Sequence, residues 1–428
     1  MTWGWPWPEA IFNMRPHPRD VTHRFLYCHG VAPIFWHNAG KPVSVRIAYV
    51  TESFPPDING VAHTALRVAE HLANRGHEPL VIAPEPADGQ PRPDRMLGYP
   101  VVRVPSFAVP VYRELRVGLP GPRLRAAVAE HNADLVHLAG PFVLGASGGA
   151  VARSLRVPTV AVYATDMAAY ARTYHAGLPG QAICWRRLRR IHNGCDRNLA
   201  PSSASAEDLR AHGVERVWIW GRGVDTVRFD PAKRSAELRV QLAPRAEVIV
   251  GYVGRLAAEK RLDLLSGVAA LPGVRLVVVG SGPAEAAARR ALPGALFLGP
   301  QHGEQLATVY ASLDVFVHAG PHDTFGNTLQ EAAASGLPVV APAAGGPIDL
   351  VDDEITGFLA APFDAGAIAA AVAKLASDPV LRTAQGQGAR RRMLGRTWSA
   401  LGDELIGHYQ AVLEGTVPRV RIPAGAPA

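Results

Sequence analysis

The chain has 428 residues, of which 48% are hydrophobic and 19% are charged, as in ordinary globular proteins. This length exceeds the roughly 250–300 residues at which a single hydrophobic core stops growing, so we expect two domains. No apolar run approaches the ~18 residues that a membrane-spanning helix needs, so we do not expect an integral membrane protein.

The net charge of +7 favours anionic partners, which include phosphates, nucleic acids and acidic lipid surfaces. Arginines far outnumber lysines, and together with the abundant alanine, glycine and proline this indicates a GC-rich coding bias behind part of the charge. No recognisable nucleic-acid-binding module accompanies it, so no nucleic-acid partner is expected. The three cysteines, Cys28, Cys184 and Cys195, form no CxxC pair and are too few for a disulfide framework, which predicts a reducing, cytoplasmic location.

The first 43 residues differ in composition from the rest of the chain, because half of the eight tryptophans fall here among prolines and histidines. The apolar run at residues 31–36 is too short for a signal-peptide core, and no small-residue cleavage site follows it. We therefore predict that residues 1–43 are a disordered extension or precede the real start near Val43. A functional aromatic anchor is the alternative.

From Arg46 onward, short β-branched runs alternate with longer helical patterns, which is the signature of a parallel α/β fold. The turn-rich stretch at residues 221–231 separates two halves of similar size. This predicts two Rossmann-like domains, residues 44–225 and residues 226–397. The predicted strands are, in chain order, residues 46–50, 79–83, 101–104, 134–138, 159–162, 197–200, 216–219, 248–253, 275–279, 295–298, 314–318 and 338–340.

A last helical pattern follows the second half. Leu401, Leu405, His408 and Val412 recur at helical spacing, which predicts a helix over residues 398–414. Such a helix can pack back across the linker onto the first domain. Residues 415–428 are rich in proline, glycine and arginine, and we predict that they form a loose tail.

The loop after the first strand runs from Thr51 to Asn59, and a helix is expected to begin at Gly60 or Val61. A glycine at a helix N-terminus lets a ligand approach closely, and the free amides there favour an anionic or hydroxyl-rich group. The alternative is a stiff connection between strand and helix that binds no ligand.

Two basic residues, Arg255 and Lys260, follow the strand predicted at residues 248–253, at the edge where open α/β sheets bind ligands. The guanidinium can hold a diphosphate through two parallel hydrogen bonds, and the ammonium can act as a point charge. Two solvated surface cations would give the same pattern. The glycine-rich turn at residues 280–282 lacks the third glycine and the acidic residue of a dinucleotide-binding fold, which argues against NAD.

The richest motif covers residues 320–340. A helix is expected to start at Phe325 and to direct its free amides and positive end at the preceding loop, where Asp323 can accept hydroxyl hydrogen bonds. Glu331 lies eight residues further on and is suited to accept hydrogen bonds from two ribose hydroxyls. The alternative is that Asp323 caps the helix and Glu331 lies on a solvated face. The glycine pair at residues 345–346 allows a close backbone approach to sugar phosphates or forms a simple turn.

In this context the motif at residues 320–340 resembles the donor-binding signature of the retaining glycosyltransferases of family 4. Arg255 and Lys260 match the diphosphate-binding pair of that family. The likeness covers about residues 46–413 and includes the loop ending at residues 59–61 and the linker at residues 223–229. Within the family, the chain looks similar to actinobacterial GDP-mannose-dependent α-mannosyltransferases at residues 52–61, 162–166 and 314–318.

The resemblance implies the GT-B fold, an α/β architecture in which two Rossmann-like domains face each other across a cleft and a C-terminal helix crosses back to the N-terminal domain. It implies that residues 44–225 bind the acceptor and that residues 226–397 bind the nucleotide sugar. The implied reaction transfers a hexose, mannose from GDP-mannose, to a lipid or glycolipid acceptor in cell-envelope glycolipid synthesis. The nucleotide sugar is a co-substrate, no other cofactor or metal is implied, and Asp352-Asp353 is interpreted as a solvated turn.

The resemblance also implies roles for single residues. The catalytic group comprises Asp166, which positions the acceptor, and the residues that hold the sugar and the departing diphosphate, Asp323, Arg255 and Lys260. The donor-binding residues are Gly60, Arg255, Lys260, His302, Asp323, Thr324, Phe325, Gly326 and Glu331, with His302 in the loop beside the base. The acceptor-binding residues are Asn59, Tyr163 and Asp166.

Two positions depart from the family pattern. Asp323 stands where relatives carry glutamate, one methylene longer, so the sugar contact or the sugar preference can differ. Ala164 stands where many relatives carry a histidine, so no catalytic histidine is assigned there. The alternatives are therefore a UDP-sugar transferase acting on a soluble acceptor, an epimerase, or a non-catalytic nucleotide-sugar-binding protein.

Two segments of the first half, residues 111–125 and 183–190, interleave arginines with apolar residues. This pattern suits an anionic membrane surface and predicts peripheral contact at the inner face of the plasma membrane. In the second segment, Cys184, Leu188 and Ile191 share one helical face, so an ordinary core helix with its arginines in solvent is the alternative.

Overall fold

The computed structural model describes residues 37–38, 41–42, 44–57, 59–87, 89–109, 112–140, 142–164, 177–245 and 247–415. Residues Met1–Val43 form a unit of their own, whose described residues make one antiparallel pair, β1 (His37–Asn38) with β2 (Lys41–Pro42). The predicted disorder of most of residues 1–43 and the predicted loose tail beyond Gly415 lie outside the described residues. Among the helices that the structure describes, none is both long and apolar enough to cross a membrane.

The first large sheet has eight strands in the order β12-β11-β10-β9-β3-β4-β6-β5, and only the β5–β6 pair is antiparallel. These strands are β3 (Arg46–Val50), β4 (Glu78–Pro84), β5 (Arg95–Met96), β6 (Tyr99–Val104), β9 (Leu135–Leu138), β10 (Thr159–Val162), β11 (Arg197–Ala200) and β12 (Val217–Ile219). The described helices around it are α1 (Gly60–Asn74), α2 (Pro122–Glu130), α3 (Leu144–Leu155), α5 (Gly177–Asn193) and α6 (Ser203–Ala211).

Strand β3 shows why a central strand of this sheet is mostly apolar. Its alternate residues enter two different cores, with Ile47 and Tyr49 packing against α1 on one face and Ala48 and Val50 packing towards α2 and α3 on the other. A parallel strand that is covered on both faces has no solvent side, so its sequence is continuously hydrophobic.

The second sheet has six parallel strands in the order β15-β14-β13-β16-β17-β18. These are β13 (Val248–Val253), β14 (Val274–Val279), β15 (Leu296–Gly299), β16 (Val315–Val317), β17 (Val339–Pro342) and β18 (Gly357–Ala360). The helices are α7 (Ala236–Leu242), α8 (Ser266–Ala269), α9 (Glu285–Ala291), α10 (Gly303–Ser312), α11 (Asn327–Ala334), α12 (Pro347–Leu350), α13 (Ala365–Ser377) and α14 (Pro379–Leu394), with 3-10 turns η2 (Pro231–Lys233), η3 (Ala258–Lys260) and η4 (Leu262–Leu265).

Each of the predicted strands is confirmed, and the two Rossmann-like sheets are present. The sequence did not predict β18 or the hairpin of β7 (Ser106–Val109) and β8 (Tyr112–Gly118). The segment 111–125 is therefore not one amphipathic element, because β8 occupies its first part and α2 begins at Pro122. Arg116, one of its basic residues, is held inside the hairpin by hydrogen bonds to the Glu85 carbonyl oxygen and the Ser106 hydroxyl, both at 2.8 Å.

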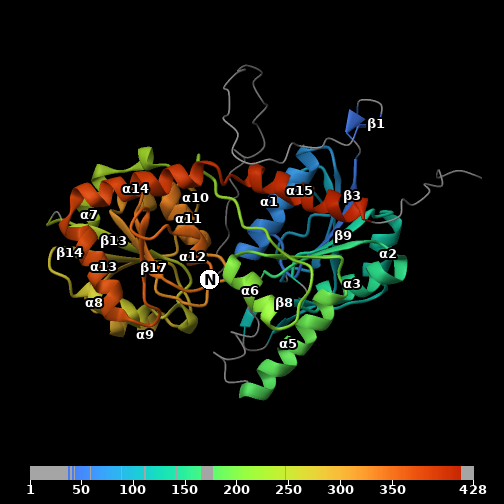
Figure 1. The fold of residues 1–428 in the computed structure, drawn as a ribbon, viewed down its shortest axis with the longest axis horizontal. Coiled ribbons are helices and arrows are strands. Elements are labelled where there is room, and N and C mark those ends of the chain that lie inside the picture. The colour runs from blue at the N-terminus through green and yellow to red at the C-terminus, as the bar shows by residue number, and fades with distance from the viewer. Residues whose placement is uncertain are drawn as a thin grey trace, which may run out of the picture. The chain divides into compact units, whose positions relative to one another are not determined.

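The C-terminal helix α15 (Trp398–Glu414) returns to the first sheet, as predicted. The linker and the start of α15 run side by side, paired through Val224 and Thr397. Beyond them, Trp220 donates from its indole nitrogen to the Leu401 carbonyl oxygen at 2.8 Å, and α15 packs against α1 (Figure 1). Gly402 permits this packing, since a Cβ there would lie 2.3 Å from the ring of His71.

Both sheets have a point where the strand order reverses. In the second sheet β13 lies between β14 and β16, and in the first sheet β3 lies between β4 and β9. Loops leaving the carboxyl ends of strands on the two sides of such a point diverge and leave room for a ligand. Residues 254–260 follow β13 and residues 318–326 follow β16, so the predicted donor motifs meet at the reversal point of the second sheet.

Candidate active site

The loop after β13 and the loop after β16 are joined by an ion pair. Lys260, which ends the η3 turn, pairs through its ammonium with the carboxylate of Asp323. Both side chains are about one-fifth exposed, so the pair is mostly buried but still reaches solvent. Arg255, in the same loop as Lys260, is exposed to solvent. Two of the predicted diphosphate and sugar contacts therefore touch each other.

His318 is a third member of this group, and it was not among the residues predicted for the site. Its Nε2 atom lies 2.9 Å from the second carboxylate oxygen of Asp323. Burial by itself would raise the pKa of Asp323, but the positive charges of Lys260 and His318 outweigh it and hold this pKa well below its usual range. Asp323 is therefore a carboxylate at all physiological pH values. The signal that could have found His318 is a polar ring at the carboxyl end of a buried strand.

Glu331 lies on α11 and has a different environment. Tyr310 donates a hydrogen bond from its hydroxyl to Glu331 Oε2 at 2.9 Å. Burial raises the pKa of Glu331 to about 7, although the hydrogen bond from Tyr310 and the charge of Arg228 oppose this shift. Its carboxyl group therefore changes charge near neutral pH. A glutamate on a solvated helix face, which was the alternative, would keep its ordinary pKa.

The start of α11 corrects one prediction. The helix begins at Asn327 and not at Phe325, because Gly326 has φ +106°, a left-handed conformation that no residue of a right-handed helix adopts. Phe325 is buried in the core of this domain instead, at 4% exposure. The amides that the helix leaves free near the loop are consequently those of its first turn, after Gly326.

Glycines allow the loop after β13 and the loop after β16 to pack closely against neighbouring backbone. A Cβ on Gly346 would lie 2.0 Å from the Phe325 carbonyl oxygen, and the Gly346 amide donates to the Asp323 carbonyl oxygen at 2.7 Å. In the same way, a Cβ on Gly280 would lie 2.0 Å from the Gly254 carbonyl oxygen. The close approach expected at residues 345–346 thus exists, but its partner in the structure is the backbone of the loop that contains Asp323.

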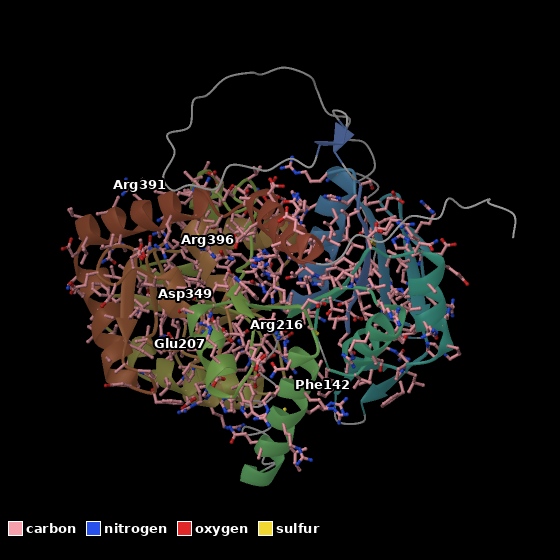
Figure 2. All side chains as sticks on the ribbon, turned by 45° about the vertical axis from the view of Figure 1, so that its right-hand side comes forward. Phe142, Glu207, Arg216, Asp349, Arg391 and Arg396 are labelled. Atoms are coloured by element: carbon pink, nitrogen blue, oxygen red, sulfur yellow. The ribbon has the colours of Figure 1, made fainter. Side chains whose placement is uncertain are left out.

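The first domain reaches this loop at two places. A Cβ on Gly60 would lie 3.1 Å from the side-chain Nδ2 atom of Asn327, which sets the start of α1 beside the start of α11. Helix α6 contacts α12, where the Asp349 carboxylate accepts hydrogen bonds from the amide and the hydroxyl of Ser203, the latter at 2.6 Å. Figure 2 marks the position of Asp349. Gly60 therefore lies beside the start of α11, and its contact with the donor stays a prediction.

Asn59 has a local task that the sequence did not reveal. Its side-chain oxygen caps α1 by accepting hydrogen bonds from the Val61 and Ala62 amides at 3.0 and 2.9 Å. Its side-chain amide donates to the Ser53 hydroxyl at 2.8 Å. Because these contacts engage both ends of the amide group, Asn59 shapes the loop before α1, and contact with an acceptor stays a prediction.

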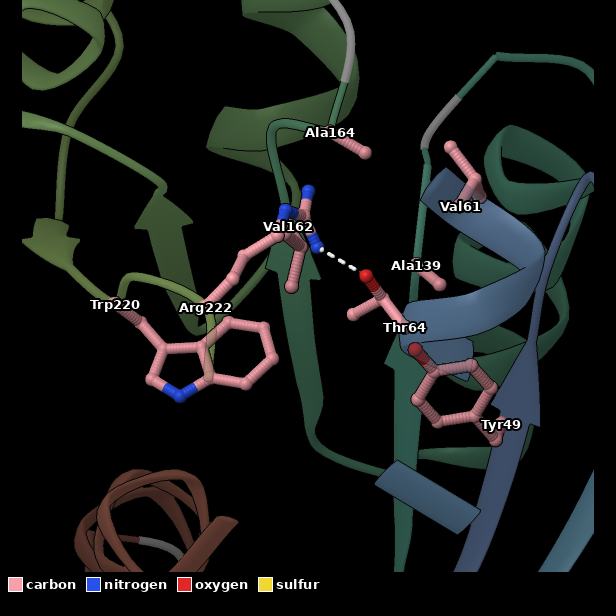
Figure 3. A pocket seen from close by; sticks show the side chains of 8 residues that line it. All are labelled: Tyr49, Val61, Thr64, Ala139, Val162, Ala164, Trp220 and Arg222. Carbon is pink, nitrogen blue, oxygen red and sulfur yellow. Dashed lines mark hydrogen bonds between the residues drawn. The ribbon is translucent and has the colours of Figure 1, made fainter. Parts of the chain in front are cut away.

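A small cavity of about 10 Å³ opens at the carboxyl edge of the first sheet (Figure 3). Ala164, Val162 and Ala139 line it together with Arg222, whose guanidinium donates to the Thr64 hydroxyl at 3.0 Å. Arg222 is only 6% exposed, and burial lowers its pKa. Arg222, which we predicted to lie in a turn of the linker, is thus a buried cation beside Ala164.

The other two residues predicted to bind the acceptor are Tyr163 and Asp166. Contact of Tyr163 with the acceptor stays a prediction, and its side chain, at 2% exposure, packs in a core with Trp185 and Leu188. The reason is strand alternation, which turns Tyr163 away from the edge that Ala164 lines. Asp166 lies outside the described residues.

The remaining candidates lie at the edges of the second sheet. His302 is exposed and immediately precedes α10, in the loop after β15, so it lies at the same carboxyl edge as the donor loops. Asp352 pairs with Arg392, and Asp353 accepts a hydrogen bond from the Leu359 amide at 2.9 Å. The acidic pair thus supports the turn before β18.

Comparison with known proteins places this geometry in a family. Residues 58–228 match the sequence profile of Glycosyltransferase Family 4, and residues 234–392 match that of Glycosyl transferases group 1. GDP-mannose-dependent alpha-mannosyltransferases of Mycobacterium tuberculosis and Corynebacterium glutamicum are 47% and 43% identical to the chain, over 86% of it and over 97% and 89% of the relatives. The chain is a family 4 glycosyltransferase.

A more distant relative of this glycosyltransferase, at 30% identity over 84% of the chain and 97% of the relative, is a GDP-mannose-dependent alpha-(1-6)-phosphatidylinositol monomannoside mannosyltransferase of M. tuberculosis. Among solved structures, sucrose-phosphate synthase from Thermosynechococcus elongatus superposes with a TM-score of 0.70 at 23% identity, over 87% of the chain and 100% of that protein. Anabaena HepE in complex with UDP gives 0.68 at 20%, over 86% and 100%. The glycosyltransferase therefore has the GT-B fold, as its sequence predicted.

Proposed function

We propose that this glycosyltransferase transfers mannose from GDP-mannose to a lipid or glycolipid acceptor, with retention of the anomeric configuration. The observation that carries the proposal is the meeting of Lys260 and Asp323 at the reversal point of the second sheet, with Arg255 in the same loop. A cation pair suits a sugar-linked diphosphate, and a carboxylate beside it suits sugar hydroxyls. The names of the relatives that are 43–47% identical support GDP-mannose, and the phosphatidylinositol-mannoside relative supports a lipid acceptor.

In this mechanism the bond between the mannose C1 atom and the β-phosphate oxygen breaks, and the acceptor oxygen bonds to C1 on the same face. The acceptor proton passes to an oxygen of the departing diphosphate, so GDP leaves and no further reactant is needed. Arg255, Lys260 and the first-turn amides of α11 stabilise the charge that grows on the diphosphate. Asp323 accepts hydrogen bonds from the sugar, Glu331 accepts them from the ribose, and Asp166 positions the acceptor.

In the decisive experiment, the purified protein is incubated with radiolabelled GDP-mannose and with membranes from the organism that encodes it, which supply the acceptor. We expect label in the lipid extract, and about 10²–10³-fold less label with Lys260→Ala. Tight GDP binding without transfer or hydrolysis would instead support a non-catalytic sensor. Thermal shifts with GDP and UDP separate the donor classes, because the nucleotide that binds the native state raises the melting temperature. Stabilisation by UDP alone would favour the UDP-sugar alternative.

We also propose that helix α5 rests on an anionic membrane surface, which would bring the enzyme to a lipid acceptor. Trp185 and Leu188 bury one face of α5 in the core, at 7% and 5% exposure, and Ile183 is 67% exposed. The arginines of this helix are exposed as well, at residues 186, 187, 189 and 190. The described part of α5 thus has one face in the core and its arginines in solvent, which leaves a basic surface open to anionic lipid.

Vesicle flotation tests this surface. The protein should float with phosphatidylglycerol vesicles at low salt and less at high salt, because charge attraction to anionic lipid is screened. Arg186→Ala with Arg190→Ala should reduce flotation, whereas the matched change Arg289→Ala with Arg290→Ala, on α9 of the other domain, should not. Absence of binding at low salt would rule out this surface.

A further inference from the structure

His318 is a buried polar residue between the two donor loops, and the mechanism above gives it no role. It follows β16 and is 2% exposed. Its ring is parallel to that of Tyr252, with centroids 6.3 Å apart and an interplanar angle of 9°. The Tyr252 hydroxyl in turn donates to the Arg255 carbonyl oxygen at 3.1 Å. His318 therefore lies behind both loops that the donor would touch.

The contacts of the ring fix which nitrogen carries a hydrogen. His318 Nε2 lies 2.9 Å from Asp323 Oδ2 and 3.1 Å from the Gly320 carbonyl oxygen. Both partners are acceptors, so Nε2 must be the donor whether the ring is neutral or charged. The other nitrogen, Nδ1, is buried and makes no hydrogen bond with the described residues. The ring is thus a one-sided donor directed at the carboxylate.

Asp323 has two supports that differ in mobility. Lys260 holds Oδ1 with a flexible side chain whose ammonium, in the proposed function, must also meet the diphosphate. His318 holds Oδ2 with a rigid ring packed at the base of the loop. Each carboxylate oxygen can accept a second hydrogen bond, so both supports leave capacity for sugar hydroxyls.

We infer that His318 is a positioning residue that fixes the Asp323 carboxylate for recognition of the donor sugar while Lys260 turns to the diphosphate. This inference rests on the proposed function, in which Asp323 contacts the sugar. It explains how a side chain as short as aspartate can be held at the sugar position: its orientation comes from a buried ring rather than from the ligand. It also places sugar discrimination partly in a residue that does not touch the sugar.

The test compares the dissociation constants of GDP-mannose and GDP by calorimetry, because their ratio isolates the sugar contact. In His318→Leu we expect GDP-mannose to lose about tenfold in affinity while GDP changes by less than about twofold, as for one charge-assisted hydrogen bond. His318→Gln, whose amide nitrogen reaches the place of Nε2, should restore most of the loss. Asp323→Asn should show the same selective loss, and His318→Leu in that background should add little.

Equal weakening of GDP and GDP-mannose in His318→Leu, or an undiminished effect in the Asp323→Asn background, would overturn the inference. If His318→Leu does not fold, judged by circular dichroism, His318→Gln and His318→Asn provide the comparison, because only glutamine presents a donor at Nε2. Failure of the proposed function is visible separately in the wild-type protein, as binding of a uridine rather than a guanosine sugar nucleotide. The same single and double variants are then compared for binding of that sugar nucleotide and of its parent nucleoside diphosphate.

Discussion

The carboxyl edges of the two sheets are built on different principles. At the second sheet, the Asp323 carboxylate contacts both Lys260 and His318. These neighbours hold the pKa of Asp323 well below its usual range. At the first sheet, the described edge is a small, mostly apolar cavity with Arg222 hydrogen-bonded to Thr64. A diphosphate carries fixed charge that must be met by preset partners, whereas an acceptor hydroxyl is recognised mainly by position and shape. We therefore expect substitutions on the two edges to separate donor binding from acceptor use.

The largest effect is expected at Lys260. Lys260→Ala removes the ammonium from the diphosphate site and leaves Asp323 with His318 alone, so transfer should fall by about 10²–10³-fold. Lys374→Ala is the matched control, because this lysine is 56% exposed and its nearest acidic partner, Glu354, is 4.0 Å away. Initial rates and GDP affinity measure the effect. Wild-type turnover in Lys260→Ala would break the assignment of this edge to the donor.

The next effect is on stability at the donor loop. Gly346 has an ordinary helical φ of −61°, so Gly346→Ala acts through space alone: its Cβ would meet the Phe325 carbonyl oxygen at 2.0 Å. We expect a loss of about 1–3 kcal/mol in the free energy of unfolding and weaker GDP binding. Gly395→Ala, where nothing lies within 4 Å of the new Cβ, should be neutral or slightly stabilising. Denaturant unfolding measures the free energy of unfolding of the two variants. Equal values would show that the loop around Phe325 can move to accommodate the new Cβ atom.

A smaller effect depends on pH and concerns Glu331. Since burial raises its pKa to about 7, its contribution to the free energy of unfolding is fully present below its ordinary pKa and is lost as the pH rises through 7. Ribose hydroxyls need the ionised form as acceptor, so GDP affinity should increase with pH up to about 7, by no more than about tenfold per pH unit. Glu331→Gln should remove this dependence and bind about tenfold less tightly at pH 8. Parallel pH profiles in both proteins would contradict the ribose contact.

The smallest effect is expected on the acceptor edge. Ala164→Leu crowds the cavity beside Arg222 and should raise the KM for the acceptor about three- to fivefold, which is roughly 1 kcal/mol or less. GDP affinity should not change, because the substitution lies outside the donor loops. Calorimetry and acceptor titration measure the two properties. A change in GDP affinity as large as the change in KM would show that the two edges are not independent.

The sequence by itself determined twelve of the strands and the contiguous motif at residues 320–340. Buried parallel strands are continuous apolar runs, and glycine-rich turns mark their ends, so the twelve predicted strands could be found locally. The segment at residues 320–340 is contiguous, and its acid, loop and helix could be recognised together, although Gly326 moved the helix start to Asn327.

Only the tertiary structure decided which side chains meet. Asp323 touches Lys260 because β13 and β16 are neighbours in the sheet, although the two residues are 63 positions apart in the chain. Tyr163 packs in a core, and Arg222 is buried rather than part of an open turn. Local sequence fixes backbone periodicity, but burial and charge pairing are set by what other strands and helices bring alongside.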